Sequence, residues 1–250
     1  MTLRTIVVVM AMADEAEPVI AALRAEPIPV PSRRPHRWWA AEVGPTRVVI
    51  AVNGTDARFG IPAIGPEPAV LNTAAVIDHL APDLIVSAGT AGGWASRGGA
   101  IGKVYLAHPH VVRHDRRIDI PVFDEFGLGR FPVVPTAGLA AAIGAEPGVV
   151  TTGGSLDESP EDRRIIEAAG AVAKDMEAAA VAHTCEMLGV PFTALKVITD
   201  LHDVPATNAE QFVANLAAAS ASLAEHLVSM LRQMAGRRLE DLEGLGGAGG

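Results

Sequence analysis

The sequence predicts an α/β protein built around a largely parallel sheet. Short runs rich in β-branched residues alternate along the chain with segments whose apolar residues recur at helical spacing, which is the pattern of this fold class. In addition, the 250 residues are 49% hydrophobic and only 20% charged. That length and composition allow one α/β domain, or at most two small ones, to bury a proper core.

The expected strands are the short apolar runs, and in chain order they are residues 5–10, 37–42, 47–52, 84–87, 104–107, 149–152 and 192–198. Helical spacing is clearest in two segments, which we expect to dock on the sheet. The first places Ala16, Val19, Ile20 and Leu23 on one face, and the second does the same with Phe212, Leu216, Leu223, Leu227, Met230 and Met234.

Another helix is expected to begin after Ser159, because this capping hydroxyl is followed by a proline and by two acidic residues that favour the start of a helix. The stretch 27–35, rich in proline and arginine, is expected to be a loop. We expect a domain of residues 1–236 and a C-terminal tail, 237–250, whose glycine-rich end from residue 244 is expected to be disordered.

Charge and cysteine content exclude several classes of protein. The chain has 29 acidic against 20 basic residues, a net charge of −9, so we expect neither nucleic acid nor an anionic membrane as a partner. Cys185 is the single cysteine, which excludes an internal disulfide framework and fits a reducing compartment. Acidic residues directly follow the first apolar run, which is therefore a poor signal sequence. The expected location is the cytoplasm.

Three motifs fail on closer reading. Gly102-Lys103 lacks the earlier glycine and the following hydroxyl of a phosphate-binding loop, and the first strand leads into Ala11-Met12-Ala13 without a dinucleotide fingerprint. His108, His110 and His114 lack cysteine or carboxylate partners at a recognisable ligand spacing. We therefore expect no metal site and read these histidines as surface or network residues.

Acidic side chains stand where strands end or helices begin. Glu15 follows the first strand, Glu177 begins an alanine-rich helix, and Asp200 directly follows the strand 192–198. Each, taken singly, is explained by a helix cap or a helix-dipole interaction. However, the glycine-rich stretch from Ser87 to Gly93 also follows a strand, and we expect it to form a turn whose backbone donors could hold ligand oxygens. Together these features favour a polar pocket at the carboxyl edge of the sheet.

At these positions the chain resembles the methylthioadenosine/S-adenosylhomocysteine nucleosidases, in particular their plant-type branch, within the purine nucleoside phosphorylase superfamily. The resemblance covers nearly the whole chain. It is carried, in the family's order, by Ala11-Met12-Ala13-Asp14-Glu15-Ala16, Ala88-Gly89-Thr90-Ala91-Gly92-Gly93, residues 114–121, Ser155-Leu156-Asp157, Lys174-Asp175-Met176-Glu177 and Val197-Ile198-Thr199-Asp200-Leu201.

The resemblance implies a single domain with a central, mixed, twisted sheet flanked by helices. It also implies hydrolysis of the bond between adenine and a 5'-thio-substituted ribose, without a metal or organic cofactor. Glu15 then matches the general base that activates water, and Asp200 the general acid that protonates the imidazole ring of adenine. Glu177 matches the residue that binds the ribose hydroxyls.

The remaining site positions also follow from the resemblance. Met176 matches a residue packed under the sugar, while Leu156 and the backbone of Asp157 match the lining of the base. The loop beside the water corresponds to Thr90, Ala91 and Gly92. Members of the family are dimers in which a neighbouring subunit closes the pocket, and this implies a homodimer whose partner pocket contains Ile120, Pro121 and Phe123.

Elementary chemistry agrees with these roles. Cleavage of a glycosidic bond through an oxocarbenium-like sugar needs a proton for the leaving group and an activated water, which is a task for two carboxyl groups. The apolar run before Asp200 predicts that this side chain is buried, whereas a helix start favours the ionised form of Glu177.

The sequence departs from the family at Gly154 and Lys103, where aspartates are usual, and these changes leave the preferred 5'-substituted nucleoside open. Two alternatives also stay open. A nucleoside phosphorylase of the same fold needs cationic side chains at a phosphate site, but Val86, Ser87 and Ala88 precede the glycine stretch. A non-catalytic nucleoside-binding protein would be free to lose the acids that this chain keeps.

Overall fold

The computed structural model describes residues 1–31 and 35–246. Its strands are β1 (Thr5–Met10), β2 (Glu26–Ile28), β3 (Arg37–Val43), β4 (Thr46–Val52), β5 (Leu84–Gly93), β6 (Val104–Arg113), β7 (Phe131–Pro132), β8 (Glu146–Thr152), β9 (Ala171–Asp175) and β10 (Phe192–Leu201). Its helices are α1 (Ala13–Leu23), α2 (Pro66–Leu80), α3 (Phe123–Leu128), α4 (Ala137–Ile143), α5 (Pro160–Ala168), α6 (Ala178–Leu188) and α7 (Asn208–Met234), with the 3₁₀ turns η1 (Ala95–Arg97) and η2 (Leu239–Gly246).

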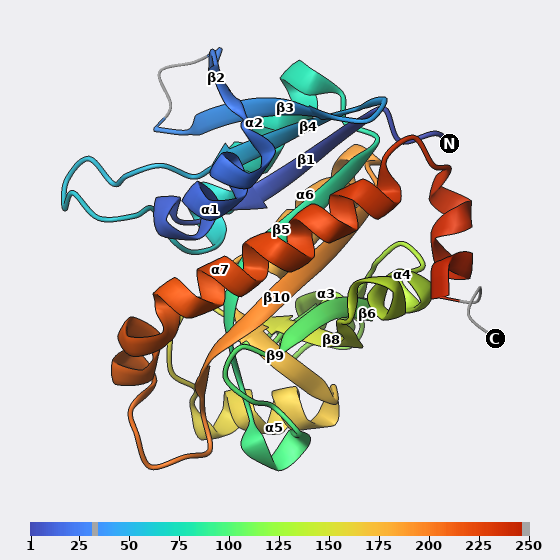
Figure 1. Cartoon of the computed structure of the whole chain (residues 1–250). Coiled ribbons are helices and arrows are strands. Elements are labelled where there is room, and N and C mark those ends of the chain that lie inside the picture. Colours follow the sequence, from blue (N-terminus) through green and yellow to red (C-terminus); the bar gives the residue numbers. More distant parts are fainter. Residues whose placement is uncertain (32–34, 247–250) are drawn as a thin grey trace.

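All strands belong to one sheet of ten strands in the order β10-β6-β8-β9-β5-β1-β4-β3-β2, with β7 paired to β6. A further pairing joins β10 to β5, so that β5, β10, β6, β8 and β9 close into a ring of paired strands. The pairs of β1 with β4 and β5 are parallel, whereas β3 with β4 and β10 with β6 are antiparallel. The sheet is therefore mixed, and it twists visibly across the molecule (Figure 1).

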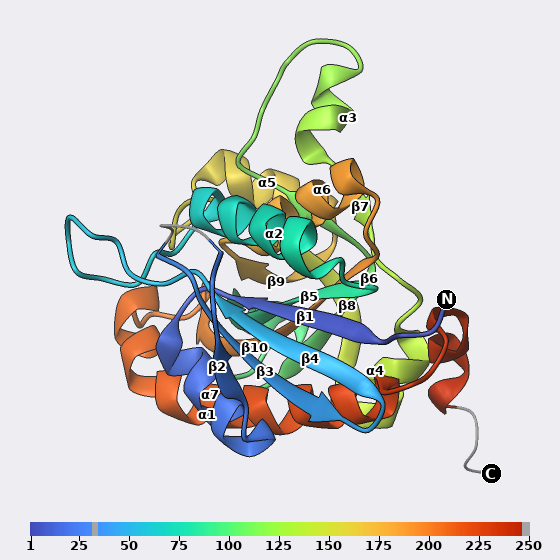
Figure 2. The ribbon, with the colours of Figure 1, turned by 90° about the horizontal axis from the view of Figure 1, so that it is seen from above.

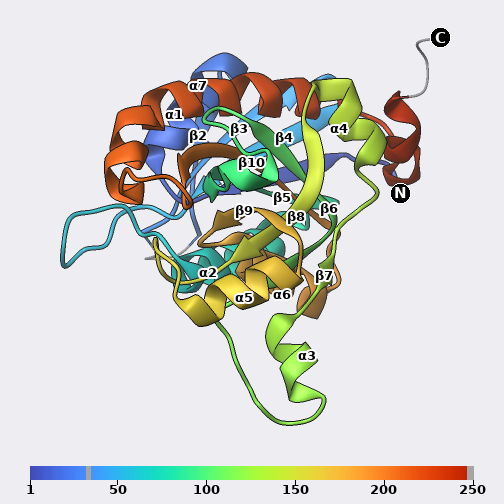
Figure 3. The same cartoon turned by 90° about the horizontal axis from the view of Figure 1, so that it is seen from below.

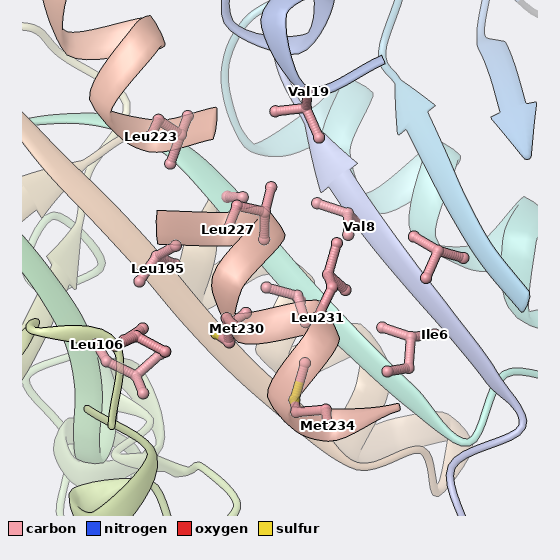
Figure 4. Packing of buried hydrophobic residues seen from close by; sticks show 14 of the residues in the cluster. Ile6, Val8, Val19, Leu106, Leu195, Leu223, Leu227, Met230, Leu231 and Met234 are labelled. Carbon is pink, nitrogen blue, oxygen red and sulfur yellow. The ribbon is translucent and has the colours of Figure 1, made fainter. Parts of the chain in front are cut away.

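Helices cover both faces of the sheet (Figures 2 and 3). On one face α1, α4 and α7 pack over β1, β10 and β6, and residues of α7 such as Leu227 and Leu231 meet Ile6 and Val8 of β1 (Figure 4). On the other face α2 and α6 bury alanine- and valine-rich surfaces against the opposite side chains of the same strands. This arrangement confirms the predicted α/β fold with helices on both sides of a mixed sheet.

The predicted strands all exist, and several are longer than predicted. The prediction missed β2, β7 and β9 and did not identify α2, α3 or α4. The strand β9 was missed because its sequence, Ala-Val-Ala-Lys-Asp, ends in charged residues that look exposed, although Lys174 and Asp175 are both 4% exposed in the structure. The helix start after Ser159 is confirmed, because the Ser159 hydroxyl and the side chain of Asp162 form a reciprocal cap on α5.

Part of the expected tail is packed against the domain. The 3₁₀ turn η2 lies against α4, and Leu242 within it is fully buried in the core cluster that α7 contributes to. The expected disorder of residues 247–250 concerns a segment outside the described residues. Within the expected loop 27–35, Pro27 and Ile28 instead pair with β3 as part of β2. In the described part of the chain, no helix combines the length and apolar character needed to cross a membrane.

Candidate active site

A cavity of about 220 Å³ opens at the carboxyl ends of β1, β5, β9 and β10. Most of the site residues expected from the sequence line it, because parallel strands bring the residues that follow or end them to one edge of the sheet. The expected residues that line the cavity are Glu15, Thr90, Ala91, Gly92, Leu156, Met176, Glu177 and Asp200.

Glu15 lies in the first turn of α1, directly after β1, and is 2% exposed. Its Oε1 atom accepts hydrogen bonds of 2.7 Å from both the backbone N–H and the hydroxyl of Thr90. Its Oε2 atom, equally buried, has no partner within residues 1–31 and 35–246. Burial raises the pKa of the Glu15 carboxyl above its ordinary value, and the bonds from Thr90 oppose that rise only in part.

Asp200 lies inside β10 and not after it as predicted, at a bulge that interrupts the pairing with β5 between Ile198 and Asp200. The extra residue of a bulge redirects the side chains around it, which turns this carboxylate toward the cavity. Asp200 is 2% exposed, as the apolar run before it predicts. Its Oδ1 accepts from the Thr199 hydroxyl at 2.8 Å and its Oδ2 from the Asn208 amide at 2.6 Å.

The glycine-rich stretch expected to form a turn is instead the second half of β5, which runs to Gly93. Its glycines serve close packing against the acidic side chains. A Cβ atom at Gly89 would lie 3.2 Å from Oε1 of Glu15, and one at Gly92 would lie 2.9 Å from Oδ2 of Asp200 and 2.4 Å from Nε2 of His202. The missing side chains therefore let both carboxylates approach the strand, and the stretch was misread because glycine is also the usual residue of a turn.

Glu177 is the residue that precedes α6, and its Oε1 accepts a hydrogen bond of 2.8 Å from the backbone N–H of Gly65. The sequence predicts an ionised carboxylate at this helix start, but burial of the side chain opposes its ionisation. Burial, followed by the negative charge of Asp175, raises the pKa of Glu177 to about 7. Desolvation and a like charge thus outweigh the helix start in the free protein.

The segment Ser155-Leu156-Asp157 is anchored by Lys174. The ammonium group of this buried lysine donates to the carbonyl oxygens of Ser155, at 2.6 Å, and Leu156, at 2.9 Å. Leu156 and Lys174 line the cavity, while Asp157 is exposed and is not among the lining residues of the described chain. Lys174 itself was not predicted to have a role, although it lies in the quoted motif.

The expected partner-pocket residues lie apart from the cavity. Ile120 and Phe123 are 55% and 52% exposed, and with Pro121 they occupy the segment that leads into α3 and projects from the body of the molecule (Figure 2).

The two positions that depart from the family, Lys103 and Gly154, have ordinary partners. Lys103 Nζ lies 2.8 Å from Oε2 of Glu146. The backbone N–H of Gly154 donates to Asp115 at 2.6 Å.

Three of the described lining residues lie outside the motifs that carry the resemblance, and sequence reasoning missed them: Ile64 before α2, His202 after β10 and Phe212 in α7. His202 stacks on Trp94 with 5.3 Å between ring centroids, and its Nδ1 lies 3.1 Å from the amide of Asn208. A signal existed for two of them, because His202 closely follows Asp200 and Phe212 begins the apolar stripe of α7. The apolar stripe was predicted to pack on the sheet, but its first residue, Phe212, faces the cavity.

The described residues contain no group of three or more histidine, cysteine or acidic side chains arranged to hold a metal ion. Of the histidines considered as ligands, His114 is buried with its Nδ1 2.9 Å from the hydroxyl of Thr151. The chemistry that the cavity offers is therefore that of carboxyl groups, the buried Lys174 and backbone donors around a mostly apolar lining.

The raised pKa of Glu177 predicts a pH-dependent effect of Glu177→Gln on stability. An acid whose folded pKa, about 7, exceeds its ordinary value of 4.5 binds its proton more tightly in the folded state. Its contribution to stability is full at low pH and is lost as the pH rises from 4.5 to 7. The melting temperature of Glu177→Gln minus that of the wild type should therefore increase between pH 5 and pH 8.

Glu186→Gln is the matched control, because Glu186 is an exposed acid on the same helix. Its difference from the wild type should not change with pH. A difference for Glu177→Gln that stays constant or shrinks over this range would show that Glu177 is ionised in the free protein.

Comparison with known proteins gives a consistent assignment. A family model described as the phosphorylase superfamily matches residues 5–232. A 5'-methylthioadenosine/S-adenosylhomocysteine nucleosidase of Arabidopsis thaliana is 38% identical over 241 residues, which are 95% of this chain and 94% of that relative. An Arabidopsis 5'-methylthioadenosine nucleosidase is 41% identical over 196 residues, which are 78% of this chain and 73% of that relative.

Solved structures agree. The apo structure of Arabidopsis 5'-methylthioadenosine nucleosidase superimposes with a TM-score of 0.94 at 37% identity and covers 97% of this chain and 100% of its own. A futalosine hydrolase of Helicobacter pylori, with a TM-score of 0.74 at 22% identity over 92% of this chain and 98% of its own, shares the fold. The chain belongs to the phosphorylase superfamily and, within it, to the methylthioadenosine/S-adenosylhomocysteine nucleosidases.

Proposed function

We propose that this protein hydrolyses the N-glycosidic bond of 5'-methylthioadenosine or S-adenosylhomocysteine, releasing adenine and the thio-substituted ribose. The observation that carries the proposal is the meeting of Glu15, Glu177 and Asp200 in one cavity of a chain whose plant relatives have this activity. Cleavage of such a bond needs an acid for the leaving base and a base for the incoming water.

Glu15 is proposed as the general base. Thr90 fixes one oxygen of its carboxyl group, which leaves the other to accept a proton from a water molecule. Burial makes the Glu15 carboxylate a stronger base than an exposed one, since its pKa is raised. The activated oxygen forms a bond to C1' of the ribose as the bond from C1' to the adenine nitrogen breaks.

Asp200 is proposed as the general acid. Its proton passes to the imidazole-ring nitrogen of adenine, which neutralises the electron pair that the base takes from the broken bond. Thr199 and Asn208 hold the two oxygens of this side chain in a fixed orientation. Because one side chain donates a proton and another accepts one, the proposed reaction uses no metal or organic cofactor.

Glu177 is proposed to bind the ribose hydroxyls. A carboxylate accepts from both hydroxyl donors, so substrate favours the ionised form of a group whose pKa in the free protein is about 7. Met176, which lines the same cavity, is proposed to pack under the sugar, and Leu156 beside the base. The backbone of Asp157 is also proposed to line the base, which requires the segment Ser155-Leu156-Asp157 to move toward the base.

A homodimer is also proposed. Ile120, Val122, Phe123 and Phe126 gather large apolar side chains, each more than half exposed, on one projecting segment. Exposed apolar clusters of this kind mark interfaces. We infer that this segment of one copy contacts a second copy and closes the side of its cavity that takes the 5'-substituent.

Light scattering tests the assembly. The wild type should have about twice the monomer mass of 25.9 kDa at micromolar concentration. Phe123→Asp should shift the protein toward the monomer and lower activity, because a buried charge opposes association. Ile101→Asp, a change at an apolar residue that is 41% exposed elsewhere, is the control and should leave the mass unchanged. A fully active wild-type monomer would refute the proposed closure by a partner.

Glu15→Gln should lose adenine release roughly a hundredfold to ten-thousandfold and keep its affinity for the nucleoside, because an amide can hold water but cannot take its proton. Single-turnover release of adenine and binding of a non-hydrolysable analogue measure the two effects. Glu17→Gln, at an exposed acid on the same helix, is the control and should retain wild-type rates. A Glu15→Gln rate within about threefold of the wild type would leave Glu15 as a helix-start acid only.

Asp200→Asn should abolish adenine release with little change in melting temperature or analogue binding. Asparagine preserves the size of the side chain and accepts from Thr199, but it cannot deliver a proton. Asp203→Asn is the matched control, because Asp203 is an exposed acid that accepts from the backbone N–H groups of Ala95 and Ser96. Retained activity in Asp200→Asn would contradict the proposed mechanism.

A further inference from the structure

Lys196 is a buried cation next to the cavity that no step of the proposed reaction uses. It lies on β10, is 1% exposed, and is not among the described residues that line the cavity. Its Nζ atom lies 2.7 Å from Oδ2 of Asp175 and 3.2 Å from the hydroxyl of Ser87. A fully buried ammonium group is costly to desolvate, so its surroundings must compensate for its charge.

The register of the sheet directs Lys196 toward Glu15. In the parallel pair of β10 and β5, Lys196 stands opposite Gly89. Directly paired residues point to the same face of a sheet, and a Cβ atom on Gly89 would point at the Glu15 carboxylate, 3.2 Å from its Oε1. Ser87, two residues before Gly89, shares this face and accepts from Lys196. Lys196 and Glu15 therefore lie on the same side of the β5–β10 pair.

The other contact of Lys196 leads to Glu177. Oδ2 of Asp175, which binds the ammonium group, also accepts from the backbone N–H of Ala178 at 2.9 Å. Ala178 is the first residue of α6, and Glu177 directly precedes it. Lys196 is therefore held against the start of α6 on one side and faces the Glu15 carboxylate on the other.

Acidic side chains outnumber cations around the cavity, which makes the location of Lys196 important. Four acidic side chains line the cavity, namely Glu15, Asp175, Glu177 and Asp200, along with the cation Lys174. The Lys174 ammonium already holds the carbonyls of the segment beside the base, at Ser155 and Leu156. Lys196 is thus the cation placed to offset the negative charge of Glu15 and Glu177.

The pKa shifts of Lys196 and of the two glutamates are consistent with this location. Burial lowers the pKa of Lys196, but the charges of Asp175, Glu177 and Glu15 outweigh burial and raise it above its ordinary value, so the ammonium group stays charged at neutral pH. In return, Lys196 lowers the pKa of both glutamates against the effect of their burial.

We propose that Lys196 is a positioning residue that offsets the burial of Glu15 and Glu177, so that the general base and the ribose-binding group ionise over the same range of pH. The proposal rests on the proposed function for its consequence in catalysis. The ionisation of the two glutamates in the free protein is a property of the chain itself and can be measured without substrate.

Three variants separate charge from structure. Lys196→Gln keeps a hydrogen-bond donor but removes the charge, and Lys196→Arg keeps the charge. Leu195→Ala is the structural control, because Leu195 is the adjacent, fully buried residue on the opposite face of β10. Adenine release from methylthioadenosine, measured as kcat/KM between pH 5 and pH 9, is the first readout.

In Lys196→Gln the acidic limb of the pH profile should move up by about one pH unit or more, because an opposite charge at close range shifts a carboxyl pKa by that amount. Lys196→Arg should keep the wild-type limb even where its rate falls. Leu195→Ala should lower the melting temperature and leave the limb in place. A Lys196→Gln profile that differs from the wild type only in height would overturn the proposal.

The second readout is the titration of glutamate carboxyl carbons by ¹³C NMR in the substrate-free protein, assigned with Glu15→Gln and Glu177→Gln. The midpoints of both groups should rise in Lys196→Gln, and unchanged midpoints would overturn the proposal. This readout also stands if the wild type releases no adenine, which would refute only the proposed function. If Lys196→Gln does not fold alone, the same comparison is made between Asp175→Asn and the double variant Asp175→Asn, Lys196→Gln, in which the buried pair is neutral.

Discussion

The parallel pairing of β5 with β10 is the constraint on which the rest of the site depends. It sets Gly89 opposite Lys196 and Gly92 opposite Asp200, and its bulge turns Asp200 toward the cavity. The absence of side chains at the two glycines then lets Glu15 from α1 and Asp200 from β10 approach the same strand. A larger residue at either glycine would push a carboxylate away, so the sheet positions the two carboxyl groups together.

Hydrogen bonds from nearby residues partly compensate for the burial of these acidic side chains, and the rest of the fold must offset the remaining cost. Thr90 donates to one oxygen of Glu15 and Gly65 to one oxygen of Glu177, while Thr199 and Asn208 donate to the two oxygens of Asp200. Even so, desolvation raises the pKa of both glutamates, which means that ionising either one costs more here than in water. The extensive apolar packing of α7 against β1 and β10 supplies the stability against which this cost is set (Figure 4).

Much of the fold could be predicted from the sequence, because β1 and β4 contain continuous apolar runs, β10 is rich in apolar and β-branched residues, and α7 carries a long apolar stripe. The second half of β5 could not be predicted, because its glycines are equally typical of a turn. Only the carboxylates packed against these glycines explain why they stand in a strand. Nor could β9 be predicted, because its charged end is buried by partners distant in the sequence. The three acids were found because they lie at strand or helix ends. His202 and Phe212 were missed because a position close to Asp200 and a place in the apolar stripe of α7 are equally typical of packing residues.

In the proposed reaction, water and not phosphate replaces adenine at C1' of the sugar. The most direct test is to incubate the protein with methylthioadenosine in ¹⁸O-labelled water, with and without phosphate, and to analyse the products by mass spectrometry. Adenine should be released at the same rate in both cases, with one ¹⁸O atom in the free thioribose. Release that requires phosphate, with an unlabelled sugar 1-phosphate as product, would contradict the proposed reaction.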